Sequence, residues 1–299
     1  MGTSSSGGGA GGKNPLIPTW VGGGSIDENT PETDTGAGQE NTGNDAPEQS
    51  NSEPSENSAQ EPHNPQQQVP NGNRYRQPRA DFSKYIRSGG SNKNALKKAL
   101  RTYSRTAAGS TTGMARRMRP SAVRVASFLG AINTVREVGS AAALQRFSLT
   151  PYAGKPLSDI LAALSEEIFK NENDAFANTQ DDNITRNAYA NTVVRICDLD
   201  GIDLDTLTNE HVETMTAIFI EETIVQRVLC DIGNKMTKIE HNIQKLVEIE
   251  ENVYQFVNGM VRNKIMSEIK ATQLGDKRQI EHKMENIYRI AFDAMAELI

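Results

Sequence analysis

Apolar residues recur every three or four positions over most of the chain from Pro120 onward, which is the spacing of one face of an α-helix. No stretch shows the alternating apolar and polar positions that are typical of a β-strand. The pattern predicts an all-α protein, namely a helical bundle of about five to six helices preceded by a long disordered N-terminal arm. The expected helices run approximately over 120–146, 156–170, 182–198, 208–233, 238–271 and 276–298.

The stretch 238–271 has the most regular pattern. Its apolar positions follow one another in steps of four, three, three, four, three and four, at Ile239, Ile243, Leu246, Ile249, Val253, Phe256 and Met260. A seam of about three heptads is typical of coiled-coil packing, either inside a bundle or between subunits. The sequence therefore predicts one long helix and, as one of two interpretations, a homo-oligomer joined through helix 239–270.

The N-terminal part of the chain consists mainly of Gly, Ser, Asn, Gln, Glu and Pro. Such a segment cannot bury enough apolar surface to offset the entropy of ordering it, so we predict a disordered arm over 1–73. One short apolar motif contains the only Trp and lies between two glycine-rich stretches, at Pro15, Leu16, Ile17, Pro18 and Trp20. The motif predicts docking to a partner, because Trp is a large anchor, and the alternative is a chance apolar patch in a linker.

The net charge of −6 is the sum of three blocks of opposite sign. Residues 1–70 carry −9, residues 71–125 carry +13 and residues 126–299 carry −10. This asymmetry predicts an arm over 1–73, a basic connector with a short helix over 74–119, and an all-α domain over 120–299.

The basic block contains fourteen Lys and Arg between residues 71 and 125. Three interpretations stay open: contact with nucleic acid, contact with an acidic protein partner, and a solvated linker. Contact with phosphates would make binding strongly dependent on salt. The candidate contact residues are Lys97, Lys98, Arg101, Arg116, Arg117 and Arg119.

Searches for catalytic motifs find no phosphate-binding GxxxxGK[ST], no GxSxG and no HExxH. The two cysteines have no CxxC spacing, and the four histidines are scattered, so the sequence predicts neither a metal site nor a cofactor. No apolar run is long enough to span a membrane, and the N-terminus has no signal-peptide pattern. We therefore expect a cytoplasmic protein that is not an enzyme.

Several segments carry a resemblance to a known family, and they are Met1-Gly2-Thr3-Ser4-Ser5-Ser6, Pro15-Leu16-Ile17-Pro18-Thr19-Trp20, Phe82-Ser83-Lys84-Tyr85, Gly113-Met114-Ala115-Arg116-Arg117-Met118, Asp205-Thr206-Leu207-Thr208 and Cys230-Asp231-Ile232-Gly233. Together they resemble the QatB family, a component of the Qat anti-phage defence system of bacteria. The resemblance implies three partners: a Qat-type ATPase, a protein similar to the deazaguanine synthase of queuosine biosynthesis, and a protein similar to TatD-type nucleases. In that set the family looks like the component without a catalytic motif of its own, and we predict that its helical body binds the ATPase. The alternative is a stand-alone nucleic-acid-binding adaptor that uses the basic segment 74–124.

The N-terminal glycine suggests a site of covalent modification. Removal of Met1 would leave Gly2 with an α-amine, and amines of this type have a pKa of about 7.7–8.0, so a useful fraction is nucleophilic near neutral pH. The resemblance supplies the chemistry, because deazaguanine synthases activate a carboxylate with ATP and transfer it to a nitrogen nucleophile. We therefore hypothesise that Gly2 accepts a deazapurine-type group, and the alternative is an ordinary free N-terminus.

Overall fold

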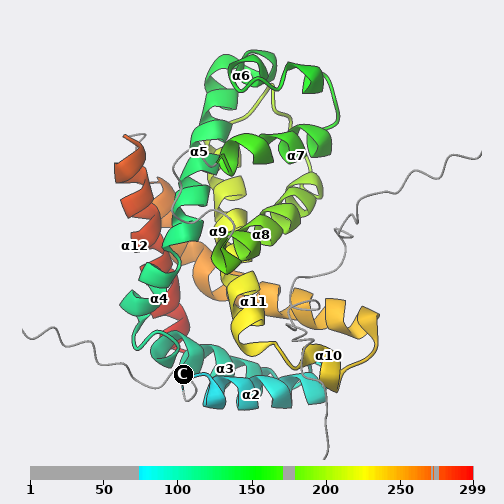
Figure 1. Ribbon diagram of the computed structural model, residues 1–299, viewed down its shortest axis with the longest axis vertical. Helices are drawn as coiled ribbons and strands as arrows, with labels where there is room; N and C mark the ends of the chain where they lie inside the picture. Colours follow the sequence, from blue (N-terminus) through cyan, green and yellow to red (C-terminus); the bar gives the residue numbers. More distant parts are fainter. Residues whose placement is uncertain (1–73, 171–178, 271, 273–275, 299) are drawn as a thin grey trace, which may run out of the picture. The chain divides into compact units, whose positions relative to one another are not determined.

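The computed structural model describes residues 74–170, 179–270, 272 and 276–298, and these residues form eleven α-helices, one 3₁₀-helix and no strand (Figure 1). The all-α prediction is confirmed, whereas the expected number of helices was too low. The elements are α2 (Arg76–Arg87), α3 (Lys93–Thr106), α4 (Thr111–Arg117), α5 (Arg119–Val138), α6 (Ser140–Arg146), η1 (Thr150–Tyr152), α7 (Leu157–Ile168), α8 (Gln180–Cys197), α9 (Asn209–Ile232), α10 (Met236–Ile239), α11 (Ile243–Lys270) and α12 (Lys277–Ala296).

One reason for the higher number is a break inside the expected helix 120–146. Gly139 has a backbone φ of 84°, which lies in the left-handed region, and it separates α5 from α6. Glycine adopts this conformation readily because it has no Cβ. The apolar period continues on both sides of the break, so periodicity alone does not reveal it.

Helix α9 forms the centre of the fold and packs against α2, α5, α8 and α11. Every residue from Met215 to Leu229 is buried, so α9 has no solvent-facing side over this length. Phe219 of α9 meets Phe128 of α5 and Tyr189 of α8 edge to face, and the ring centroids lie 5.4 Å away in both pairs. Such aromatic pairs add to the stabilisation that burial of their area provides.

The segment 74–119 differs from the expected connector with one short helix, because it forms the three helices α2, α3 and α4. Helices α3 and α4 pack against α12, and the side chains of Leu96, Leu100 and Tyr103 are fully buried in the core. The predicted short helix corresponds to α3, and the many Lys and Arg between its apolar positions obscure the fact that one side of it is buried. Helices α2 to α4 therefore share one core with the helices that follow.

Helix α11 begins at Ile243, and the short α10 precedes it, so the expected continuous helix 238–271 was wrong at its start. Leu246, Ile249 and Val253 are buried as expected, whereas Ile243 is 77% exposed. Beyond Val253, Tyr254 is also buried, and the other buried positions follow in steps of four, at Val257, Val261, Ile265 and Ile269. Phe256 and Met260 are half-buried.

The physical reason is that a straight α-helix has 3.6 residues per turn, so a strict heptad seam drifts around it. Helix α11 packs on α9 and on α12 of the same chain, and the buried stripe follows these two partners. Contact between two copies through helix 239–270 stays a prediction.

The predicted arm over 1–73 lies outside the described residues. So do Gly2 and the docking motif, which consists of Pro15, Leu16, Ile17, Pro18 and Trp20. Within the part of the chain that the structure describes, no helix combines the length and the apolar character needed to cross a membrane.

Candidate functional site

The most distinctive chemical feature of the described body is a set of charged side chains in its interior. Burial of a charge is unfavourable unless a countercharge and hydrogen bonds compensate for the lost water. The described residues include seven buried charged side chains, which are Asp81, Arg124, Asp182, Glu221, Glu222, Arg227 and Asp231. Each of the seven forms an ion pair with another side chain.

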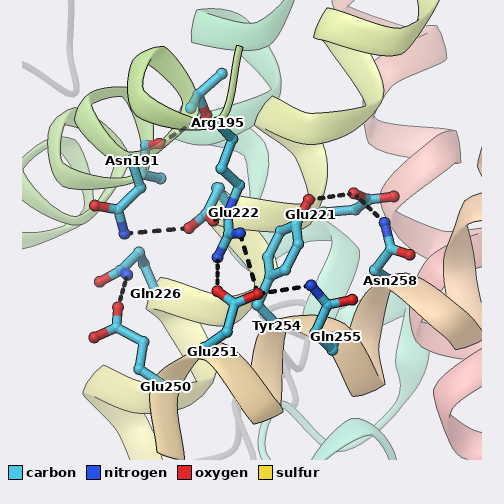
Figure 2. Close-up of polar contacts among 12 residues, drawn as sticks. Asn191, Arg195, Glu221, Glu222, Gln226, Glu250, Glu251, Tyr254, Gln255 and Asn258 are labelled. Atoms are coloured by element: carbon cyan, nitrogen blue, oxygen red, sulfur yellow. Dashed lines mark hydrogen bonds and ion pairs between the residues drawn. The ribbon is translucent and has the colours of Figure 1, made fainter. Parts of the chain in front are cut away.

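Two of these charges are adjacent on the central helix. Glu221 and Glu222 project from α9 about 100° apart, because an α-helix has 3.6 residues per turn. They therefore meet different partners, as Figure 2 shows: Glu221 is bonded by side chains of α11, and Glu222 is bonded by side chains of α8. The two carboxylates join α9 to its neighbours on two sides.

Glu221 accepts bonds from three residues that are spaced four apart on α11. Tyr254 Oη lies 3.1 Å and Asn258 Nδ2 lies 2.9 Å from Glu221 Oε2. Arg262 supplies the countercharge, with Nη2 2.7 Å from Oε2 and Nε 2.5 Å from Oε1. Burial raises the pKa of Glu221, and the charge of Arg262 together with the three donors only partly offsets this.

Glu222 forms a chain of charges with Arg195 of α8 and Glu251 of α11. Arg195 Nε donates to Glu222, and Arg195 Nη2 lies 2.7 Å from Glu251 Oε2 (Figure 2). The Arg195 guanidinium also stacks on the Tyr254 ring, 3.3 Å from its centroid. Asn191 Nδ2 donates to Glu222 at 3.3 Å. One arginine therefore ties three helices together.

The two carboxylates beside Arg195 have opposite pKa shifts. Burial raises the pKa of Glu222 to about 7, and the favourable charge of Arg195 does not fully offset this effect. For Glu251, partial burial acts in the same direction, but hydrogen bonds from Arg195 and Gln255 outweigh it and lower the pKa. The better solvated carboxylate is thus the stronger acid of the pair.

A second cluster surrounds Asp231 at the end of α9. Arg117 forms two bonds with its carboxylate, with Nη2 2.9 Å from Oδ1 and Nη1 2.9 Å from Oδ2. Tyr103 Oη donates to Oδ2 at 2.7 Å, and Arg79 Nε donates to the Asp231 carbonyl at 2.9 Å. Arg117 Nη1 also donates to Tyr75 Oη. This cluster connects α2, α3 and α4 to α9.

The third cluster surrounds the start of α8. Asp182 accepts from Arg124 at 3.0 Å and from Arg186 at 3.0 Å. Both guanidinium groups lie over the ring of Phe169, at 5.2 Å for Arg124 and 4.4 Å for Arg186 from its centroid. Arg227 of α9 pairs with Asp181 at 2.7 Å. These contacts attach α8 to α5 and α9.

The chemistry available to these clusters is limited by their pairing. No group of three or more His, Cys, Asp and Glu among the described residues could hold a metal ion. Both cysteines are free, and partial burial together with a nearby Asp raises the pKa of the Cys197 and Cys230 thiols, which disfavours the reactive thiolate. Each cluster joins at least two helices, so its evident role is to hold the helices in position.

The residues that the sequence suggests for contact with phosphates or an acidic partner occupy different environments. On α3, Lys98 and Arg101 are exposed and Lys97 is half-buried. Arg116 and Arg119 are exposed, whereas Arg117 turns towards Asp231. Contact of these residues with a partner stays a prediction.

Sequence reasoning missed the clusters around α9. A signal for them is present, because Glu221, Glu222 and Arg227 are the only charged residues in the mainly apolar stretch from Met215 to Leu229. Their partners come from other helices, and Arg117 and Asp231 are 114 positions apart. The spacing of residues along one helix gives no indication of such pairs.

The structure is an all-α body whose buried charges are paired between helices. These features define a class of protein, but they do not identify a particular one. The family model described as "Qat anti-phage system associated protein QatB" matches residues 109–295, from the loop before α4 to the last turn of α12. The match covers more than half of the chain, so the chain belongs to the QatB family and is a component of the Qat anti-phage system. No curated protein and no solved structure matches the chain.

Proposed function

We propose that this chain is a non-catalytic subunit of the Qat system that holds partner proteins together. In this role its helical body binds the system's ATPase, and its N-terminal arm presents Gly2 to the deazaguanine-synthase-like protein. The nuclease of the TatD type is a further partner of the same assembly. Membership of the QatB family supports the shared system, and the pairing of the buried charges supports the absence of catalysis.

The argument against catalysis rests on how the carboxylates are used. A general acid or base needs an oxygen that can reach a substrate proton. Glu221 is fully buried and accepts three hydrogen bonds from α11. Glu222 is equally buried and is bonded by Arg195 and Asn191. These groups stabilise the relative positions of α8, α9 and α11, which is the property that a rigid binding subunit needs.

The surface of the same helices offers a place for the ATPase. Val194 of α8 is 60% exposed, and Ile243 and Val247 of α11 are 77% and 54% exposed. These side chains lie on the two helices that the Arg195–Glu251 ion pair joins. Exposed aliphatic side chains on a fixed pair of helices suit a contact with another protein.

Replacing Val247 with aspartate is expected to reduce the amount of ATPase that co-purifies with this chain by about tenfold or more, because a charge would enter an apolar contact. The matched control is Asn263→Asp, which adds the same charge to an exposed position further along α11. Both variants should keep the thermal stability of the native chain. Equal recovery of the ATPase with Val247→Asp and with Asn263→Asp would exclude this surface.

The proposed modification of Gly2 predicts a change in mass. The Gly2 amine would attack the carboxyl group that the partner has activated with ATP, an amide bond would form, and AMP would leave as the amine loses a proton. Chain co-expressed with the active partner should therefore yield an N-terminal peptide heavier than unmodified Gly2-Thr3-Ser4. Co-expression with a catalytically inactive partner is the control, and Trp20→Ala should lower the modified fraction if the motif docks the arm. An unmodified peptide in the presence of the active partner would refute the modification.

A second candidate function is a stand-alone nucleic-acid-binding adaptor that uses the basic segment 74–124. The exposure of Arg101, Arg116 and Arg119 favours it. Binding through these residues would weaken as salt rises, with a log–log slope that flattens by about 0.9 for each duplex phosphate contact that is removed.

A further inference from the structure

Helices α2 and α3 lie side by side in antiparallel directions (Figure 1). At one end, Thr106 Oγ1 donates to the Arg74 carbonyl at 3.2 Å, so the start of α2 lies beside the end of α3. In the middle, the ammonium groups of Lys84 and Lys98 lie 3.2 and 3.8 Å from the carboxylate of Asp81. The exposed sides of the two helices therefore adjoin at this carboxylate.

These adjoining sides carry six cations. On α2 the cations follow one another in steps of eight and three, and on α3 in steps of three and four, and these spacings place residues on one side of a helix. We call this surface the α2–α3 basic face, and its members are Arg76, Lys84, Arg87, Lys98, Arg101 and Arg105, all of them exposed.

The body itself provides little compensation for these charges. Asp81 is the only acid in residues 74–119, it is 1% exposed, and two lysines already share it. Among the described residues, none forms an ion pair with Arg76, Arg87, Arg101 or Arg105. Like charges held close together repel each other, so a bound polyanion would relieve this repulsion.

The face offers no large apolar side chain to a protein partner. Among the described residues, the large apolar side chains that are exposed are Val194, Ile243 and Val247, and they belong to α8 and α11. Protein interfaces have a desolvated centre that large side chains fill. Phosphate and sugar oxygens, by contrast, receive at least half of the hydrogen bonds between proteins and DNA, and cations are sufficient to bind them. The composition of the face therefore favours a nucleic acid over an acidic protein.

The four aromatic residues of segment 74–119 are not free to stack on bases. Phe82, Tyr85 and Tyr103 are fully buried in the core. Tyr75 is half-buried, and the guanidinium group of Arg117 lies over its ring, 5.7 Å from the centroid. Proteins hold single strands by combining cations with aromatic side chains on which the bases stack. The face therefore suits a duplex, in which the bases are already stacked and the phosphates lie outside.

The dimensions of the face fit a short stretch of duplex. At about 1.5 Å per residue, the 12 residues of α2 extend over about 18 Å and the 14 residues of α3 over about 21 Å. Duplex DNA carries one phosphate charge for about every 1.7 Å of its axis. A duplex aligned with the helices would present about eleven phosphates over this length, so each of the six cations could contact one.

We propose that the α2–α3 basic face binds double-stranded nucleic acid through its phosphates, without reading the order of the bases. The proposal rests on the second candidate function, nucleic-acid binding by the segment 74–124, and assigns that function to one surface. Arg116 on α4 and Arg119 on α5 lie outside this face, and Arg117 is paired with Asp231. Residues 126–299 carry a charge of −10, which disfavours a duplex elsewhere on the body and orients it towards the face.

The test measures binding of fluorescent 20-base-pair duplexes to the full-length chain at increasing salt. With six phosphate contacts, the slope of log K against log salt should be about −5, and affinity should fall about 10³-fold between about 50 and 200 mM salt. Two DNA duplexes of unrelated sequence should bind equally well, because phosphate contacts carry no sequence information. A single strand of the same length should bind more weakly and with a flatter slope. DNA and RNA duplexes of one sequence are compared, and the tighter of the two identifies the kind of duplex that the face prefers.

Two double variants locate the contact. Arg87→Glu with Arg101→Glu removes one cation from each helix of the face, whereas Arg116→Glu with Arg119→Glu makes the same change of charge at exposed positions outside it. The first pair should weaken duplex binding by about tenfold or more and flatten the slope by about 1.8, because two contacts are lost. The second pair should leave the slope native-like. Both variants should keep the thermal stability of the native chain.

A measurement on the native chain needs no variant. Bound duplex at low salt should protect Lys84 and Lys98 from acetylation by an amine-reactive reagent, because their ammonium groups would face phosphates. Lys264 is exposed on α11 and serves as the control, since it should react at the same rate with and without the duplex. Mass spectrometry of peptides measures these rates.

The outcomes separate the surface from the function. If Arg116→Glu with Arg119→Glu flattened the slope and the other pair did not, the chain would bind nucleic acid through another surface, and only the proposal about the face would fail. If the native chain bound no duplex at low salt, nucleic-acid binding itself would be excluded as well.

Two other results would also overturn the proposal. Tighter binding of poly-glutamate than of the duplex would assign the face to an acidic protein. Equal acetylation of Lys84 and Lys98 in the free and the duplex-bound native chain would show that the face makes no contact, even if a variant failed to fold.

Discussion

Replacing Arg262 with alanine is expected to lower the free energy of unfolding by about 3–5 kcal/mol, the largest effect among the substitutions considered for this protein. Glu221 is fully buried, and Arg262 is its only ion-pair partner among the described residues. Without the guanidinium, an uncompensated carboxylate would remain inside the body. Urea denaturation followed by circular dichroism at neutral pH measures the loss.

A second variant distinguishes the buried charge from lost packing. Adding Glu221→Gln to Arg262→Ala should restore a large part of the stability, because a neutral amide can still bond to Tyr254 and Asn258. The matched control is Arg289→Ala, which removes an exposed pair with Asp293 and should change stability by about 0.5 kcal/mol or less. Equal losses for Arg262→Ala and Arg289→Ala would contradict the assigned role of Glu221.

The second large effect depends on pH and arises from Glu222. Its pKa is about 7 in the folded chain, against an ordinary value of 4.5. Between these values the folded state binds more protons than the unfolded state, so the contribution of Glu222 to stability falls as pH rises. At about 1.4 kcal/mol per pH unit, the loss reaches about 3 kcal/mol above pH 7.

Glu222→Gln removes the titrating group and should remove this part of the pH dependence. Between about pH 4.5 and pH 8, the unfolding free energy of the native chain is therefore expected to fall by about 3 kcal/mol relative to that of Glu222→Gln. Urea denaturation at a series of pH values measures it. The control is Glu248→Gln, which removes an exposed carboxylate from α11 and should leave the profile native-like. If the unfolding free energies of the native chain and Glu222→Gln changed in parallel with pH, a raised pKa of Glu222 would be excluded.

Hydrophobic periodicity predicted the helical class and the positions of α7, α8, α9 and α12 well, because these helices bury a face with the ordinary spacing. It missed the helices α2 and α4, which lie in the segment predicted to contain one short helix, and it missed the break at Gly139, which ends α5 without changing the period. In both cases the packing of the surrounding helices determines where a helix forms or ends, and the sequence of a single segment does not contain that information.

The candidate site was less predictable than the fold. Glu221 and Glu222 look like surface residues by composition, since Glu is seldom buried. What makes them buried is that α9 is covered by α5, α8 and α11, and what makes them tolerable is the placement of Arg195 and Arg262 on the covering helices. Both conditions arise only when the chain folds.

The attachment of α2 and α3 to the end of α9 has a consequence for the choice of fragments. The family match begins at Gly109, yet Arg79 and Tyr103 precede it and bond to Asp231 inside it. A fragment cut at Gly109 would lose two of the donors that surround Asp231 and would uncover the surface of α12 on which α3 packs. A fragment that starts at α2 keeps these contacts, and the region matched by the family model is smaller than the set of helices that share the core.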